Sequence, residues 1–133
     1  MTDHPPALQR CVAIGALSAA IGVGLGAFGA HGLRPLLTTE MLALFEVGVR
    51  YQMYHAGGMI AAGLLGLAFP HYKGYFMAAG WSFGLGTLLF SGTLYLLALT
   101  GARWLGAITP LGGILFIIGW LVLAAACLRR PGA

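Results

Sequence analysis

Four long apolar runs limit what this chain can fold into more than any other feature of its sequence. They cover approximately residues 11–30, 51–69, 75–99 and 104–128, and none contains Asp, Glu, Lys or Arg. A helix needs about 20 residues to cross a hydrocarbon core about 30 Å thick, and each run is close to that length or longer. Because a helix pairs its backbone polar groups within one segment, each run predicts a transmembrane α-helix.

The composition excludes an ordinary soluble domain. Hydrophobic residues make up 59% of the 133 residues, and charged residues only 8%, whereas soluble domains are about 25% charged. The mean hydropathy is +0.90. With so few charges, water could not cover a folded surface of this size. We therefore expect an all-α fold, a single membrane domain over residues 1–133 that forms a bundle of four transmembrane helices.

The connections between the runs predict how the helices are arranged. Those at residues 70–74 and 100–103 are short, which predicts antiparallel neighbours. The first connection, residues 31–50, is much longer. Thr38 and Thr39 can cap a helix there, and residues 39–50 mix apolar and charged side chains. We expect an amphipathic helical segment at the membrane interface, which can continue directly into the second span.

The cations predict the orientation of the chain. With four spans, both termini and the second connection share one side, and that side carries one more cation than the other. Its four cations are Arg10, Lys73, Arg129 and Arg130, against Arg34, Arg50 and Arg103 on the opposite side. We therefore expect a multi-pass protein of the cell (inner) membrane with both termini in the cytoplasm. Cys11 and Cys127 would then face a reducing compartment, where no disulfide is expected.

Several classes of function lack support in the sequence. The net charge is +4, but the basic residues form no patch or recognition motif, so nucleic-acid binding is excluded. No Cys or His spacing predicts a metal site, and no cofactor is expected. The only aspartate is Asp3, in the N-terminal tail, so no Ser/His/Asp arrangement exists and we expect no enzyme.

Glycine is abundant, with 22 residues, and many glycines lie four residues from another small residue within a run. Small residues allow membrane helices to approach closely, which predicts tight helix packing. Packing within one bundle is favoured over homodimerisation, although the spacing fits both. The candidate packing glycines are Gly22, Gly26, Gly29, Gly58, Gly80 and Gly84.

Polar side chains gather in the half of the predicted membrane domain opposite the termini. One interpretation is a polar pocket with two titratable histidines. Ionisable residues inside a membrane usually mark a functional site, which favours this interpretation. The other is that these groups hydrogen-bond one another and hold the helices together, which is common and needs no ligand. The candidates are His31, Glu46, Arg50, Tyr51, Gln52, His55, Ser91, Tyr95 and Thr109.

Several motifs carry a family resemblance. The run Gly26–Leu33 (GAFGAHGL) resembles the signature of domain-of-unknown-function family 423, small membrane proteins that include an enterobacterial inner-membrane protein and are related to animal transmembrane protein 256. Supporting matches are Tyr51-Gln52 with His55, Leu89–Tyr95 and Thr109–Gly113. The resemblance implies four spans and an inner-membrane or mitochondrial location, and it implies no activity.

Three hypotheses for function follow. The first is a structural or accessory membrane protein whose partners are membrane lipid, a second copy of the chain in a homo-oligomer, or a larger membrane complex. Small size and glycine-rich helices favour it. The alternative is a small-molecule or ion carrier that uses the polar pocket. The third is redox work with haem or quinone, although His31 and His55 lie near run ends, which disfavours axial haem ligation.

Overall fold

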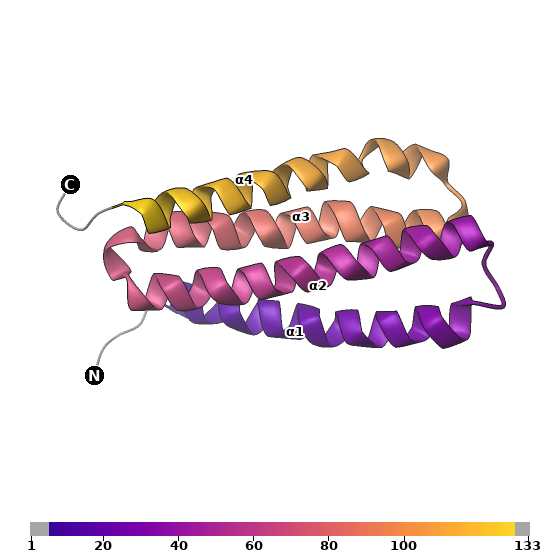
Figure 1. The fold of residues 1–133 in the computed structure, drawn as a ribbon, viewed down its shortest axis with the longest axis horizontal. Coiled ribbons are helices and arrows are strands. Elements are labelled where there is room, and N and C mark those ends of the chain that lie inside the picture. The colour runs from indigo at the N-terminus through magenta and orange to yellow at the C-terminus, as the bar shows by residue number, and fades with distance from the viewer. Residues whose placement is uncertain (1–5, 130–133) are drawn as a thin grey trace.

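The computed structural model describes residues 6–129, and within that range the regular elements are all helical. Each long helix runs antiparallel to the next one along the chain (Figure 1). The predicted all-α fold with four long helices is therefore confirmed. The helices are α1 (Pro6–Phe28), α2 (Thr39–Ala68), α3 (Lys73–Thr100) and α4 (Thr109–Leu128). Asp3 and Arg130, used in the predictions above, lie outside the described residues.

Short helical segments join these elements. The π-helical turn η1 (Gly29–Leu33) continues α1, and the 3-10 turns η2 (Pro70–Tyr72) and η3 (Arg103–Ala107) precede α3 and α4. Gly101 ends α3 with φ 71°, a left-handed conformation that glycine adopts without steric cost. The last two connections are thus tight, as their short sequences predicted.

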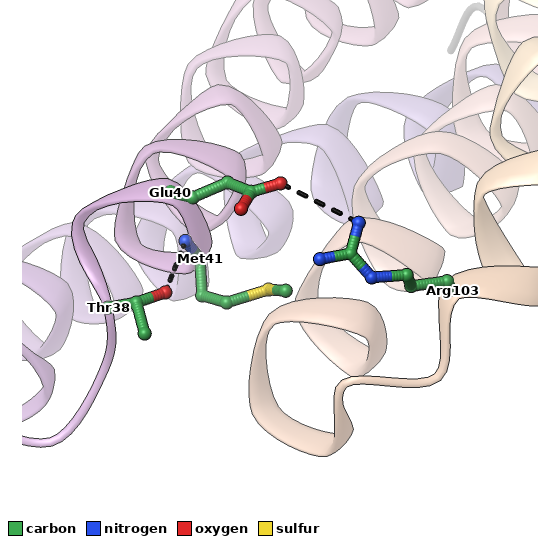
Figure 2. A network of polar contacts seen from close by, with 4 residues as sticks. All are labelled: Thr38, Glu40, Met41 and Arg103. Carbon is green, nitrogen blue, oxygen red and sulfur yellow. Dashed lines mark hydrogen bonds and ion pairs between the residues drawn. The ribbon is translucent and has the colours of Figure 1, made fainter.

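The predicted amphipathic segment is the beginning of α2 and not a separate helix. Thr38 caps α2, because its hydroxyl accepts a hydrogen bond of 3.2 Å from the backbone N–H of Met41 (Figure 2). The predicted cap at Thr38 is confirmed. Beside it, Glu40 forms an exposed ion pair of 3.8 Å with Arg103 of η3. This pair joins the start of α2 to the connection before α4.

Three helical stretches among the described residues are long and apolar enough to cross a membrane. They are Pro6–Leu33, Pro70–Thr100 and Arg103–Leu128. The 30-residue α2 is long enough, since 30 residues at about 1.5 Å each reach about 45 Å. It is absent from this set, and it carries Gln52 and His55 in its otherwise apolar part. Composition therefore supports three spans directly, one fewer than predicted.

The helices form an open layer and not a closed bundle. Extended interfaces join α1 to α2, α2 to α3 and α3 to α4. Contacts between α1 and α3 and between α2 and α4 are few. In the described residues, α1 and α4 share no comparable interface, although the first and last helices of a closed up-down bundle are neighbours. Figure 1 shows the resulting order, with α1 and α4 at opposite edges.

Glycines set the close contacts that hold this layer together. A Cβ on Gly112 of α4 would overlap the backbone nitrogen of Phe90 and lie 2.8 Å from the carbonyl oxygen of Gly86, both in α3. A Cβ on Gly15 of α1 would lie 2.9 Å from the carbonyl oxygen of Ala56 in α2. Helix backbones therefore approach each other directly at these points, as small residues allow.

The six candidate packing glycines all face side chains of other segments of this chain. Added Cβ atoms would come within 3.2 Å of another residue at Gly22, Gly29, Gly58 and Gly80. At Gly26 the nearest atom is Val49 Cγ1 at 3.4 Å, and at Gly84 it is the flexible Met59 Cε at 3.3 Å. These contacts are intramolecular, and they leave homodimerisation as a prediction.

Candidate functional site

Gln52 links three helices from the centre of the layer. The side chain is 5% exposed. Its Oε1 accepts a hydrogen bond of 2.6 Å from the hydroxyl of Tyr95 in α3, and its Nε2 donates one of 2.9 Å to the backbone carbonyl of Ser18 in α1. Both ends of the amide are therefore paired, and each pair crosses a helix interface.

A second contact fixes Tyr95 against α2. The Ser91 hydroxyl donates to the backbone carbonyl of Gly48 over 2.6 Å. Gly48 also makes room for the tyrosine ring, because a Cβ there would lie 2.8 Å from Tyr95 Cε1. On its other side the ring packs on Phe45, with centroids 4.8 Å apart. These contacts position the hydroxyl of Tyr95 for Gln52.

His55 of α2 uses both ring nitrogens. Its Nδ1 lies 2.6 Å from the backbone carbonyl of Tyr51, which can only accept a hydrogen bond, so Nδ1 carries the proton. Its Nε2 accepts a hydrogen bond of 3.1 Å from the indole N–H of Trp120 in α4. The two bonds together assign the neutral tautomer with hydrogen on Nδ1. Phe116 stacks on the imidazole, with centroids 3.4 Å apart and planes 5° apart.

A threonine pair joins α3 to α4. The hydroxyls of Thr93 and Thr109 lie 2.7 Å apart. Thr93 also contacts the carbonyl oxygen of Leu89 at 2.6 Å, and Thr109 that of Leu105 at 3.2 Å, each in the preceding turn. In the range 6–129, no buried side-chain nitrogen or oxygen lacks a hydrogen-bond partner. The buried polar groups therefore have their bonding capacity met by the protein itself.

The structure brings together some of the predicted polar candidates and separates others. Gln52, Ser91 and Tyr95 lie at one interface, while His55 and Thr109 lie at two others. His31, Glu46 and Arg50 are exposed. Within the described chain, none of these three makes a hydrogen bond or ion pair with another candidate. Tyr51 is 37% exposed and contributes its carbonyl to His55.

Several partners in these networks were not among the predicted residues, among them Ser18, Gly48, Thr93 and Trp120. Ser18 contributes a backbone carbonyl, which every residue has, so no sequence signal marks it. Trp120 did carry a signal. It lies in the interior of the fourth apolar run, whereas tryptophans that anchor a helix lie near its ends. A tryptophan at that depth needs a hydrogen-bond acceptor for its N–H, and His55 supplies one.

Two grooves flank the central pair of helices. The first, of about 480 Å³, lies between α1 and α3, and Gln52, Ser91 and Tyr95 are among its lining residues. The second, of about 760 Å³, lies between α2 and α4, and His55 and Trp120 are among its lining residues. The two grooves share no lining residue. Both are predominantly apolar.

Metal binding has no support in the described residues. No group of three or more His, Cys, Asp or Glu side chains lies close enough there to hold a metal ion. Cys11 is buried, Cys127 is exposed, and both are free thiols. The site therefore combines apolar groove surface with a set of buried or half-buried, hydrogen-bonded polar side chains, which we call the polar layer: Gln52, His55, Ser91, Thr93, Tyr95 and Thr109.

The comparison with known proteins identifies the family. The model of a family of proteins of unknown function (DUF423) matches residues 25–113. The chain belongs to this family. The match includes the motif Gly26–Leu33, and the resemblance inferred from it is confirmed.

Relatives of this DUF423 protein are named membrane proteins. It is 48% identical over 121 residues to the UPF0382 membrane protein of Staphylococcus epidermidis, with 91% of this chain and 97% of the relative covered. It is 43% identical over 118 residues to the UPF0382 membrane protein YwdK of Bacillus subtilis, with 89% and 95% covered. No solved structure matches the chain. Together with its three apolar helical stretches, these relatives identify the DUF423 protein as a membrane protein.

Proposed function

We propose that this DUF423 protein is an accessory protein of the cell (inner) membrane that crosses it four times and binds lipid or a larger membrane complex. The observation that carries the proposal is the open helix layer. It leaves two apolar grooves, while the buried polar side chains of the described residues all have hydrogen-bond partners within the protein. Such a molecule can bind lipid or another protein through the shape and the apolar surface of its grooves.

The packing of α2 supports a fourth span. This helix lies between α1 and α3, with extended interfaces on both. If its two neighbours cross the membrane, α2 crosses with them. Its polar residues Gln52 and His55 are buried and paired, so they do not meet lipid as unsatisfied groups. Their presence lowers the hydropathy of α2 without opposing its insertion.

The charged residues support the position of the membrane. Arg10, Lys73 and Arg129 lie at one end of the helix layer, and Arg129 stacks over the ring of Tyr75 at 4.3 Å, as interfacial side chains do. The other charges of residues 6–129 lie on the connections at the opposite end or between Thr39 and Arg50 of α2. The uncharged zone between them fits a hydrocarbon core of about 30 Å. The cation bias favours cytoplasmic termini.

The two grooves support binding of an apolar partner. Membrane helices gain little from the hydrophobic effect when they associate, because lipid tails are equally apolar, so shape complementarity and van der Waals contact drive association. A groove between two helices provides such a shape for an acyl chain or for a helix of another protein. A closed bundle would have far less of this surface.

The hydrogen bonds favour this function over a carrier. A carrier of ions or polar solutes needs polar or ionisable groups that face its path. Here Gln52, Tyr95 and His55 bond to other parts of the protein, and the exposed Glu46 and Arg50 make no hydrogen bond or ion pair with these three described residues. The polar layer accordingly acts in helix packing.

Three glycines provide the test of groove binding. Gly92 lines the first groove and has no atom within 4 Å of an added Cβ; Gly113 lines the second, with its nearest atom at 3.8 Å. Gly92→Leu and Gly113→Leu should each fill a groove. Gly24→Leu is the matched control, because Gly24 has equal space and lines neither groove. Native mass spectrometry in mild detergent should show lipid or partner bound to wild type and to Gly24→Leu, and less bound to the groove variant. A wild type without lipid or partner contradicts the proposal.

The number of spans has its own test. Four spans place both termini on one side, and three place them on opposite sides. Reporter fusions at the two termini should both be active in the cytoplasm, and a reporter inserted after Arg34 should be active outside it. Termini found on opposite sides would overturn the four-span topology.

A further inference from the structure

The second groove differs from the first in its aromatic lining. Tyr51, Tyr54, Phe90, Phe116 and Trp120 all line it, together with His55. The first groove is lined mainly by aliphatic side chains, with Trp81 and Tyr95 as its aromatic members. An acyl chain needs no aromatic wall, so the composition of the second groove points to a ligand with a ring.

The aromatic side chains form a continuous wall. The rings of Tyr51 and Phe90 have centroids 4.7 Å apart, those of Phe90 and Phe116 5.4 Å, and those of Phe116 and His55 3.4 Å. These distances lie within or below the usual range for aromatic pairs of about 4.5–7 Å. The wall extends from α2 across α3 to α4. Phe116 and His55 are buried within it, and Tyr51, Phe90 and Trp120 keep exposed surface against which a flat ring can pack.

Two phenol hydroxyls on this wall lack partners. Tyr51 is 37% exposed and Tyr54 57% exposed, and neither hydroxyl makes a hydrogen bond with any described residue. Tyr54 lies one helical turn beyond Arg50, where the uncharged part of α2 begins. An unpaired O–H in hydrocarbon is unfavourable. The hydroxyl of Tyr95, at the first groove, is paired with Gln52. The second groove thus presents hydrogen-bond donors to a ligand with acceptor oxygens.

His55 does not supply chemistry to this groove. Its Nε2 is bonded to the indole of Trp120 and its Nδ1 to a backbone carbonyl, so neither nitrogen is free to ligate iron or to exchange a proton with a ligand. The imidazole serves as part of the wall, stacked on Phe116. The site is built to bind a ring and not to react with one.

We propose that the second groove binds a prenylated quinone. This inference rests on the proposed four spans, which place Tyr54 at the outer end of the hydrocarbon core, one helical turn from Arg50. The flat ring packs on the exposed Trp120 and the partly buried Phe90, and its carbonyl oxygens accept hydrogen bonds from the phenol hydroxyls of Tyr51 or Tyr54. The isoprenoid tail follows the aliphatic rim formed by Ile114 and Ile117. No electron transfer is assigned to the protein.

Tryptophan fluorescence provides the test, because quinones quench indole emission and one tryptophan lines each groove. In Trp81→Phe/Trp104→Phe, Trp120 reports on the second groove; in Trp104→Phe/Trp120→Phe, Trp81 reports on the first. A prenylated naphthoquinone titrated into the detergent-purified protein should quench Trp120 saturably and Trp81 only weakly and linearly. Equal, unsaturable quenching of both would show simple partition into detergent and overturn the proposal.

Two further arms identify what the groove recognises. Adding Tyr51→Phe and Tyr54→Phe to the Trp120 reporter should raise the Kd about tenfold, since one to two hydrogen bonds are lost. Tyr75→Phe, at an exposed tyrosine outside the grooves, should leave it unchanged. The isoprenoid alcohol of the same tail, which lacks a ring, should not relieve quenching; relief would make the groove a general lipid site and overturn quinone recognition. Loss of quinone binding alone, with four spans and groove-bound lipid still observed, would leave the proposed function standing.

Discussion

The two grooves of the helix layer are alike in their polar layer and different in their walls. At the first, Gln52 bonds to Tyr95; at the second, His55 bonds to Trp120. In both cases a polar side chain of α2 is satisfied by an aromatic donor from a different helix. The rest of the first groove is lined mainly by aliphatic side chains, and the second mainly by aromatic ones. The polar layer therefore has the same packing role on both sides, and the walls distinguish what each groove can hold.

The largest expected effect concerns the helix contact that frames the second groove. Gly112→Ala places a Cβ against the backbone of Phe90, which cannot move away without separating α4 from α3. We expect a loss of about 2–3 kcal/mol in unfolding free energy, measured by titration with a denaturing detergent. Gly113→Ala is the control, because its Cβ finds ordinary contact at 3.8 Å. Equal effects at both glycines would show that this backbone contact does not hold α4.

Loss of the polar pair at the first groove should have the next largest effect. Gln52→Leu leaves the hydroxyl of Tyr95 and the carbonyl of Ser18 without their partner. Unfolding free energy should fall by about 1–2 kcal/mol, since a buried group left unpaired costs that much. Adding Tyr95→Phe to this variant should cause little further loss. Fully additive losses would show that the two side chains act independently.

A smaller effect is expected for the polar pair at the second groove. Trp120→Phe keeps an aromatic ring and removes the N–H that bonds to His55. We expect a loss of about 0.6–1.7 kcal/mol, the range for interhelical hydrogen bonds in membranes. Trp81→Phe is the matched control, since the indole of Trp81 makes no hydrogen bond with any residue of the range 6–129. If Trp81→Phe lowered the unfolding free energy as much as Trp120→Phe, the smaller ring and not the lost hydrogen bond would explain both losses.

The smallest effect is expected at the exposed end of the layer. Glu40 and Arg103 are 64% and 75% exposed at their side chains, and their charges lie 3.8 Å apart (Figure 2). Glu40→Gln should change unfolding free energy by less than about 1 kcal/mol, and added salt should reduce the difference further. A fall in unfolding free energy as large as that of Gln52→Leu would mean that this ion pair contributes substantially to holding the helices together.

The sequence predicted the helices better than their arrangement. Run lengths placed all four helices, and Thr38 was recognised as a cap from its hydroxyl. The open layer was not predicted, because runs that are apolar on every side carry no stripe to show which face meets which neighbour. Among the polar candidates, Gln52 and Tyr95 lie in contact, whereas His31 is exposed. The position of a residue along its run predicted how far along the helix it lies. The rotation of each helix about its own axis decided which side chains point inward.

By itself, the sequence determined that this chain is an all-helical membrane protein of the DUF423 family, because uncharged runs of this length favour lipid and its motifs match the family. Tertiary structure decided that α4 packs away from α1, which partners satisfy Gln52 and His55, and that aromatic side chains from three helices meet in one groove. The physical reason is that lipid is as apolar as the helices. Close glycine contacts and a few hydrogen bonds, and not hydrophobicity, therefore select the arrangement.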